Sequence, residues 1–300
     1  MERLAALVDK FQQRHHALAF TCAVIKKYGD DEAGHQAALL TYYGFLSLFP
    51  LLLVATSVVD FISQHNAHLR ERLLTDATSY IPVVGQQLQH NIGSSRTGLA
   101  LVVGLLFALY GARGIADAVR NALDAVWGTP KRKRAGFPMR LAKSFGLLFG
   151  AGTGLLLTTA LASYATAALG RSFIFRLVPL AINAVLLYLI VMYVFLVGPS
   201  RRRPRRDLRL GAIATVIGLL ILQTVGGYLI THELRNTSGA YGQFALVLTL
   251  MFWLYLLAQV FMYSVEINVV HTHRLWPRSL TGHSPTAADE KAARLHTSEL

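Results

Sequence analysis

Six long apolar stretches divide this 300-residue chain, and basic residues gather in every second segment between them. A helix needs about 20 apolar residues to cross a bilayer, and these stretches reach that length. They cover residues 39–59, 97–118, 144–169, 177–198, 210–230 and 241–269. The sequence therefore predicts an all-α, polytopic membrane protein with six transmembrane helices.

The basic residues predict how these helices are oriented. If the amino terminus is cytoplasmic, the inner segments hold 22 of the 29 Lys and Arg residues, in 1–36, 119–143, 199–210 and 271–300. The outer segments hold six, in 61–96, 170–176 and 231–240, and the remaining one lies inside the second stretch. Cytoplasmic loops of membrane proteins carry such an excess of Lys and Arg. Both termini are therefore predicted to be cytoplasmic.

Residues 1–36 form a predicted cytoplasmic lead-in to the membrane domain. Phe11, Leu18 and Ile25 recur every seven residues, which favours an amphipathic helix lying on the membrane surface. A solvated helix packed on the helical bundle fits the same pattern. The sequence leaves both alternatives open.

The predicted membrane domain covers residues 37–270. Its one long external loop, residues 61–96, has helical apolar spacing and is expected to form a small cap on the outer surface. Residues 271–300 are polar and lack strong periodicity, so they are predicted to form a flexible cytoplasmic tail.

The net charge of +13 raises the question of nucleic-acid binding. The basic runs at 131–134 and 201–206 lie next to the ends of apolar stretches, and no aromatic residues alternate with them. We interpret them as topology anchors that also contact anionic lipid head groups. Membrane lipids are thus the predicted partners, and nucleic acid is not.

Two features of the apolar stretches concern helix shape and packing. Pro50 removes one backbone donor near the middle of the first stretch, so a kink is expected there, acting either as a hinge or as a packing feature. Gly146, Gly150 and Gly154 recur every four residues, and small residues at this spacing allow helices to approach closely. The glycines predict tight packing within the bundle, with association into a homo-oligomer as the alternative.

Ionisable residues inside a membrane are costly and often functional, and this chain has few. Arg113 and Asp117 lie four apart on the second stretch, and Glu266 lies near the inner end of the sixth. An Arg113–Glu266 contact fits the predicted topology, with Asn268 nearby. One interpretation is a polar gate or substrate contact. The other is an interhelical clamp in which Asp117 neutralises Arg113.

Uncharged polar residues form a second set of candidates for substrate contact or gating. Tyr42, Tyr43 and Asn183 either line a cavity or bond to a neighbouring helix, which is the commoner use of intramembrane polar groups. Trp127 and Trp276 fall at predicted cytoplasmic boundaries, where tryptophan anchors helices.

Motifs for catalysis and metal binding are missing from the sequence. It has no His-Glu-x-x-His pair, no Gly-x-Ser-x-Gly elbow and no phosphate-binding glycine loop. Cys22 is the single cysteine, so a disulfide within the chain is excluded. No cofactor, metal or catalytic residue is predicted, and the chain is not expected to be an enzyme.

Two patterns point to a known family. The first is Thr41-Tyr42-Tyr43 followed by Ser47-Leu48-Phe49-Pro50. The second is Tyr241-Gly242-Gln243-Phe244, then Trp253-Leu254-Tyr255-Leu256 and Glu266-Ile267-Asn268. With six apolar stretches and a basic loop after the second, residues 20–275 resemble the YihY/virulence factor BrkB family of bacterial inner-membrane proteins. Tyr263-Ser264-Val265 departs from the small residues usual in that family, so helix packing is expected to differ there.

The resemblance implies a helical protein of the bacterial inner membrane with a role in transport or export. The leading hypothesis is a transporter or translocase of an anionic lipid or other envelope-related substrate. A non-transporting scaffold that recruits partners is the alternative, and a lipid-modifying enzyme is the weaker one. Some family members carry a ribonuclease label, which no metal-binding cluster in this sequence supports.

Overall fold

The computed structural model describes part of the chain. These residues are 12, 15–63, 113–130, 136, 139, 142–147, 150–151, 153–154, 173–232, 242–279 and 285–297. Within them, the side chains of 49–63, 173–179, 226–232, 242–246 and 296–297 are not described. The predicted external cap lies outside the described residues except for 61–63, which end a helix.

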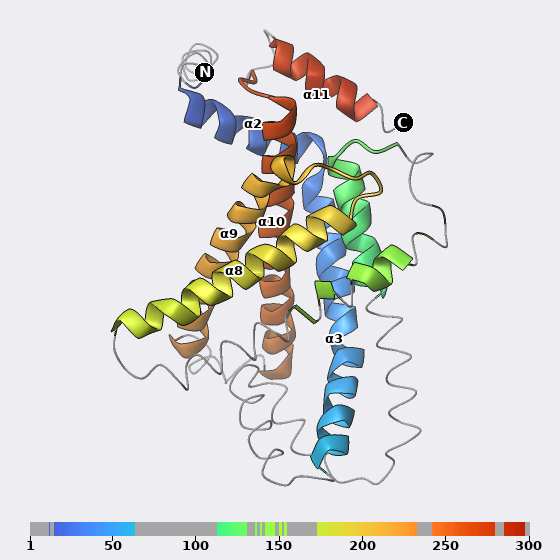
Figure 1. Ribbon diagram of the computed structural model, residues 1–300, viewed down its shortest axis with the longest axis vertical. Coiled ribbons are helices and arrows are strands. Elements are labelled where there is room, and N and C mark those ends of the chain that lie inside the picture. Colours follow the sequence, from blue (N-terminus) through green and yellow to red (C-terminus); the bar gives the residue numbers. More distant parts are fainter. Residues whose placement is uncertain are drawn as a thin grey trace. The chain divides into compact units, whose positions relative to one another are not determined.

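Every regular element in these described residues is a helix, which confirms the predicted all-α class (Figure 1). The helices are α2 (His16–Asp30), α3 (Ala33–Ser63), α8 (Phe173–Val197), α9 (Arg205–His232), α10 (Gly242–His273) and α11 (Ala287–Thr297). Residues 113–126 are also helical. Helix α3 continues through Pro50; the side chain of Pro50 lies outside the description, and its role as a hinge stays a prediction.

Three described helices are long and apolar enough to cross a membrane. The qualifying segments are Leu180–Val197 of α8, Arg205–Val225 of α9 and Val247–His273 of α10. They coincide with the last three predicted stretches. The first stretch lies within the 31-residue helix α3, while the second and third are described only in pieces. The count of six spans and their orientation therefore stay predictions.

The chain divides into two compact units, which we describe separately. The larger unit contains residues 1–40, 116–237 and 255–300, and the smaller contains 41–115 and 238–254. The candidate sites described below lie in the larger unit.

The core of the larger unit surrounds the carboxyl-terminal half of α10. Met262, Val265, Val269 and Val270 of this helix are almost completely buried, so several of its faces are covered by protein. Residues from α2, α8, α9 and the helical segment 113–126 pack around them. This half of α10 is therefore a central helix, and polar residues on it meet other helices.

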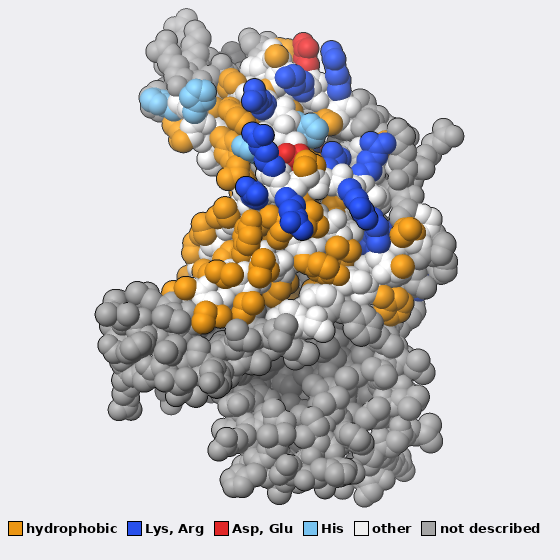
Figure 2. Space-filling view, viewed as in Figure 1, with side chains coloured by type: hydrophobic (Ala, Val, Ile, Leu, Met, Phe, Trp, Pro, Cys, Tyr) orange, Lys and Arg blue, Asp and Glu red, His pale blue; other side chains and the backbone are white. Residues whose placement is uncertain are grey.

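Helices α8 and α9 also present apolar side chains outward. Ile213, Ile217 and Ile221 recur every four residues on α9 and are about half exposed, as are Val185 and Leu189 on α8. In Figure 2 an apolar band lies beside a group of Lys and Arg side chains. A continuous apolar surface of this kind fits contact with lipid tails.

Glycines allow close helix contacts in the larger unit. A Cβ atom on Gly211 of α9 would fall within 3.0 Å of the Ser264 carbonyl oxygen on α10. The same atom on Gly150 would overlap Tyr193 of α8, and on Gly154 it would overlap Ile190. The predicted glycine stripe thus lies against α8 at the residues described.

The smaller unit contains two of the predicted polar candidates. The rings of Tyr42 and Tyr43 on α3 meet edge to face at 5.2 Å, and both side chains are exposed. The Tyr43 ring also lies against Gly114. In the same unit, the Ser47 hydroxyl donates to the carbonyl oxygen of Gly44.

The carboxyl-terminal segment, predicted as a flexible cytoplasmic tail, contains the helix α11 over residues 287–297. Thr286 and Asp289 cap this helix reciprocally. The Thr286 hydroxyl accepts from the Asp289 N–H at 3.2 Å, and Oδ2 of Asp289 accepts from the Thr286 N–H at 3.0 Å. This capping box satisfies two backbone donors that a helix start leaves unpaired.

Ionic contacts join α11 to the rest of the larger unit. Oδ1 of Asp289 lies 2.9 Å from both Nζ of Lys26 on α2 and Nε of Arg278. Arg278 also pairs with Asp30 at 2.7 Å. Burial alone would raise the pKa of Asp289, but hydrogen bonds from Ser279, Thr286 and Lys26 hold that pKa well below its usual range.

Candidate functional site

A buried ionic cluster joins α2 to α10. Glu266 has no exposed surface, and Lys27 is 3% exposed. Nζ of Lys27 lies 3.7 Å from Oε2 of Glu266 and also donates to a carboxylate oxygen of Asp31. Lys27 occupies the last turn of α2, where the helix dipole favours a cation, and Asp31 follows one turn later. One ammonium group thus serves two carboxylates.

Glu266 is under-satisfied among the described residues. Neither of its carboxylate oxygens has a hydrogen-bond partner, and the helix that carries it is apolar enough to span a membrane. A buried charge in such a helix is costly and is usually retained for a functional reason. Lys27 is the oppositely charged group within ion-pair distance of it among the described residues.

A second polar contact lies on the same pair of helices. The hydroxyl of Tyr28 on α2 donates to the side-chain oxygen of Gln259 on α10. The Tyr28 ring stacks on the Tyr263 ring, with 4.1 Å between their centroids. Tyr263, where the sequence departs from the small residues usual in the family it resembles, is thus a packing partner for α2. Burial raises the pKa of Tyr28 to about 12, which keeps its hydroxyl protonated as a donor.

Asn268 joins α10 to α9. Its side-chain oxygen accepts from the Gly211 N–H at 2.6 Å, and it is 1% exposed. Since Gly211 brings the two backbones close together, Asn268 has an interhelical packing role in this structure. Glu266 and Asn268 therefore lie on the same helix but serve different partners.

Asp117 belongs to a third polar group, on the helical segment 113–126. It accepts a 2.8 Å hydrogen bond from Ser144 and lies 3.7 Å from a guanidinium nitrogen of Arg120. Nearby, both carboxylate oxygens of Asp124 accept from Ser200, at 2.7 and 2.5 Å. The Asp124 bonds fasten the turn after α8 to the segment 113–126, and the Asp117 bond joins that segment to the helical residues 142–147.

The remaining predicted candidates are not placed at one site. Arg113 belongs to the smaller unit and Glu266 to the larger, so a pairing between them stays a prediction. Asn183 is a partly buried residue of α8. The predictions that Tyr42 and Tyr43 take part in gating are likewise untested.

Several residues of these clusters were missed by sequence reasoning. Lys27, Arg120 and Asp124 lie in segments where charge predicts topology, yet all three are buried. The spacing of four residues between Lys27 and Asp31 is a weak signal for an ion pair. The Thr286-x-x-Asp289 pattern is a stronger signal, because it is typical of the start of a helix.

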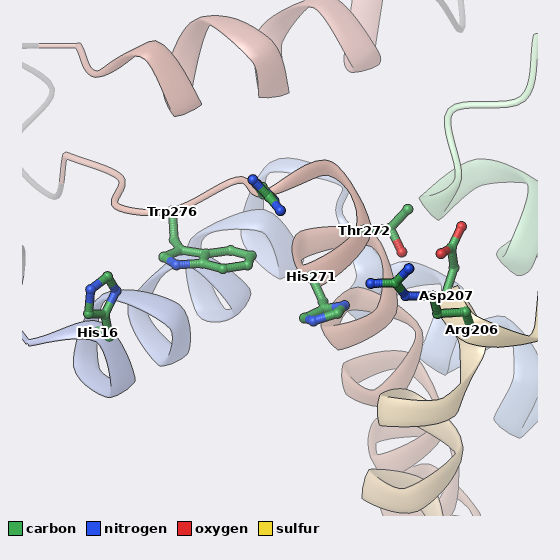
Figure 3. Close-up of a pocket in the computed structure, with 7 residues that line it drawn as sticks. His16, Arg206, Asp207, His271, Thr272 and Trp276 are labelled. Carbon is green, nitrogen blue, oxygen red and sulfur yellow. The ribbon is translucent and has the colours of Figure 1, made fainter.

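A groove of about 570 Å³ lies at the ends of two membrane-crossing helices (Figure 3). We call it the basic groove. It is lined by His16 of α2, Arg206 and Asp207 of α9, His271 and Thr272 of α10, and Arg274 and Trp276 beyond α10. The Trp276 and His271 rings are nearly parallel, 6.1 Å apart.

A second, smaller groove lies beside α11. Its volume is about 310 Å³, and it is lined by His273, Leu275, Lys291, Arg294 and Leu295. Among the described residues, no group of three or more His, Cys, Asp or Glu side chains is placed to hold a metal ion. The described grooves thus carry basic and apolar groups and no acidic cluster.

The apolar helices, the outward apolar surface and the basic residues at the helix ends define a helical integral membrane protein. Residues 24–289 match the family model described as Virulence factor BrkB. The chain is therefore a member of that family.

Of three known proteins with similar sequences, two are membrane proteins by name. The inner membrane protein YhjD of Escherichia coli (strain K12) is 26% identical over 87% of this chain and 82% of its own length. A UPF0761 membrane protein of Pseudomonas aeruginosa (strain LESB58) is 25% identical over 84% of this chain and 62% of its own length. YfkH of Bacillus subtilis (strain 168), whose name calls it ribonuclease-like, is 22% identical over 87% of this chain and 98% of its own length. No solved structure matches the chain.

Proposed function

We propose that this protein is a transporter of the bacterial inner membrane that translocates an anionic lipid or a related envelope substrate. The name of its Escherichia coli relative supports the location. The observation that carries the proposal is the fully buried Glu266 on α10, which shares one ammonium group with Asp31.

The charges of this cluster suit a contact between α2 and α10 that changes during transport. Two carboxylates against one ammonium leave an excess of negative charge, which a proton or a cation can neutralise. A change in that occupancy alters the attraction between α2 and α10, because Lys27 and Glu266 hold these helices together. Intramembrane carboxylates serve as proton relays in pumps and transporters, and we assign that type of role to Glu266.

The basic residues at the helix ends support an anionic substrate. Arg205 and Arg206 are exposed in the first turn of α9, and Arg201 and Arg202 are exposed in the loop just before it. Such residues attract the anionic lipids of the cytoplasmic leaflet, at about 1 kcal/mol for each Lys or Arg near the surface. An anionic lipid is thereby concentrated at the mouth of the helix bundle.

No catalytic role is part of this proposal. The ribonuclease-like name belongs to the Bacillus relative, and that activity is not carried over to this chain.

Reconstitution in proteoliposomes tests the proposal. Fluorescent phosphatidylglycerol is placed in both leaflets, and a membrane-impermeant quencher measures how fast it crosses. The wild-type protein should accelerate crossing, and Glu266→Gln should slow it while the protein remains folded. Glu290→Gln is the matched control, because Glu290 is exposed on α11.

Two results would contradict the proposal. One is the absence of movement for phosphatidylglycerol and every other anionic lipid offered. The other is wild-type crossing by the Glu266→Gln variant. Co-purification of a stoichiometric partner, together with tolerance of Glu266→Gln, would favour the scaffold alternative.

A further inference from the structure

The basic groove combines cations that have no acidic partner. Among the described residues, no carboxylate lies within ion-pair distance of the Arg206 or Arg274 guanidinium groups, and both side chains are exposed. Asp207 is the one acid among the lining residues. Its two arginines and one aspartate give the lining a formal charge of +1, which complements a singly charged anion.

The place of the groove in the chain fits the membrane–water boundary. The membrane-crossing segment of α10 ends at His273, and that of α9 begins at Arg205. Arg274 and Arg206 directly adjoin these two ends. Trp276 is half-buried beside them, and tryptophan is enriched at the depth of lipid head groups. The two arginines are therefore positioned where head-group phosphates lie.

Thr272 supplies a hydroxyl with no partner. Its Oγ1 atom is buried and makes no hydrogen bond with the described residues. Three other helical threonines, Thr21, Thr215 and Thr224, each donate to the carbonyl oxygen four residues earlier. Thr272 lines the groove instead (Figure 3). A rotation of the Thr272 side chain toward the groove would let this hydroxyl donate to a ligand oxygen, which is the partner that it lacks.

Arg274 stands where the backbone favours glycine. Helix α10 ends with hydrogen bonds from Leu275 N–H to Val270 and from Arg274 N–H to His271, with Arg274 at φ 52°. The segment 113–126 ends in the same motif, and its residue of positive φ is Gly128. A non-glycine residue there is strained. The strain is understandable if the guanidinium at this position has a function.

The geometry points to the basic groove as a binding site for the phosphodiester group of an anionic lipid. Arg206 and Arg274 bind the phosphate oxygens, Thr272 donates one hydrogen bond, and Trp276 lies at the boundary with the acyl chains. A formal charge of +1 on the lining is neutralised by the monoanionic diester of phosphatidylglycerol. This inference rests on the proposed function in that it names the substrate class of the translocase.

Lipid binding is measured on the full-length protein, apart from any transport. Native mass spectrometry counts retained phosphatidylglycerol, and a titration in nanodiscs gives its affinity, with phosphatidylcholine as the neutral lipid. Arg274→Gly keeps the backbone geometry and removes the guanidinium, and Arg206→Gln removes the second cation. Each should weaken binding roughly tenfold, the loss of one hydrogen bond to a charged group. Thr272→Val should weaken it by less.

Arg209→Gln provides a matched control, because Arg209 is an exposed arginine of α9 that lies outside the basic run 201–206 and does not line the groove. It should bind phosphatidylglycerol within twofold of the wild type. Equal affinity of wild type, Arg274→Gly and Arg206→Gln would overturn the inference. So would an equal loss in the Arg209→Gln control, because it would show that only overall charge matters.

Inorganic phosphate and glycerol phosphate distinguish a lipid from a soluble source. Failure of both to compete at millimolar concentration supports the lipid head group. Competition that Arg274→Gly abolishes supports the same phosphate site with a soluble ligand. If binding is specific to the groove but no lipid crosses the membrane, the proposed function fails and the site stands. If Arg274→Gly and Arg206→Gln bind and move phosphatidylglycerol as the wild type does, the inferred site is wrong and the proposed function stands.

Discussion

Nζ of Lys27 lies 3.7 Å from Oε2 of Glu266, and both side chains are almost completely buried. This contact joins α2, which precedes the first apolar helix, to α10, which contains the last membrane-crossing segment. It therefore closes the larger unit between two distant parts of the chain. Removing the Lys27 ammonium group should therefore lower the free energy of unfolding.

Lys27→Met should destabilise the protein by about 3–5 kcal/mol, because it leaves two buried carboxylates without their ammonium partner. Adding Glu266→Gln should restore much of that loss, since one uncompensated charge is then removed. Unfolding of the purified protein in detergent measures both effects in a double-mutant cycle. Additive losses would show that the two residues do not interact.

Gly211→Ala should destabilise the protein by about 1–3 kcal/mol, the usual cost of overpacking. The new methyl group would collide with the Ser264 carbonyl and the Asn268 side chain. Gly29→Ala is the control, because a methyl group at that position would have no neighbouring atom within 4 Å. Thermal unfolding of the two variants should separate them, and equal midpoints would contradict the close contact.

Docking of α11 should persist as the pH is lowered to about 5. Burial acts to raise the pKa of Asp289, but hydrogen bonds from Ser279, Thr286 and Lys26 outweigh it. The folded-state pKa is therefore below its usual value. Its contribution to stability is present above the unfolded-state pKa of about 3.9 and is lost as the pH falls through the folded-state pKa. Hydrogen exchange in α11, corrected for the intrinsic exchange rate at each pH, should show unchanged protection from about pH 7 to 5 and falling protection only below about pH 4.

Asp289→Asn should release α11 at neutral pH, because the ion pairs with Lys26 and Arg278 disappear together. Trypsin cleavage after Lys291 should then be faster than in the wild type. Glu290→Gln, an exposed neighbour, should leave cleavage unchanged. Resistance of the Asp289→Asn variant to trypsin would show that apolar contacts alone hold the helix.

Arg274→Gly should be more stable than Arg274→Ala by about 1 kcal/mol, because only the alanine variant retains a Cβ at positive φ. Both lose the guanidinium group, so the difference isolates the backbone. Equilibrium unfolding of the two variants gives the value. A more stable alanine variant would mean that Arg274 does not hold the left-handed conformation.

The charge pattern predicts that residue 238 is external and residue 284 cytoplasmic. In a Cys22→Ser background, Ser238→Cys should react with a membrane-impermeant maleimide added to intact cells, after the outer membrane has been made permeable. Ser284→Cys should react only after the inner membrane is opened. The reverse pattern would invert the predicted topology and weaken the argument from basic inner loops.

The fold was largely predictable because bilayer-crossing helices need long apolar runs, and such runs are visible without any tertiary contact. Helices α8, α9 and α10 coincide with predicted stretches for this reason. Glu266 and Asn268 were also visible, as polar residues inside an apolar run. Their partners were not, because Lys27 and Gly211 lie in segments where charge and small size have other common explanations.

The sequence by itself determined that this chain is a helical membrane protein and which polar residues interrupt its helices. Composition and spacing act along the chain, and those properties follow from them. Only the tertiary structure decided that Glu266 meets Lys27, that α11 is fastened through Asp289, and that Arg206 and Arg274 share one groove. These are contacts between residues distant in sequence, which depend on how helices pack and not on the pattern within any one of them. The alternating charge of the loops predicted lipid contacts in general, and the fold located the two arginines that we propose to make them.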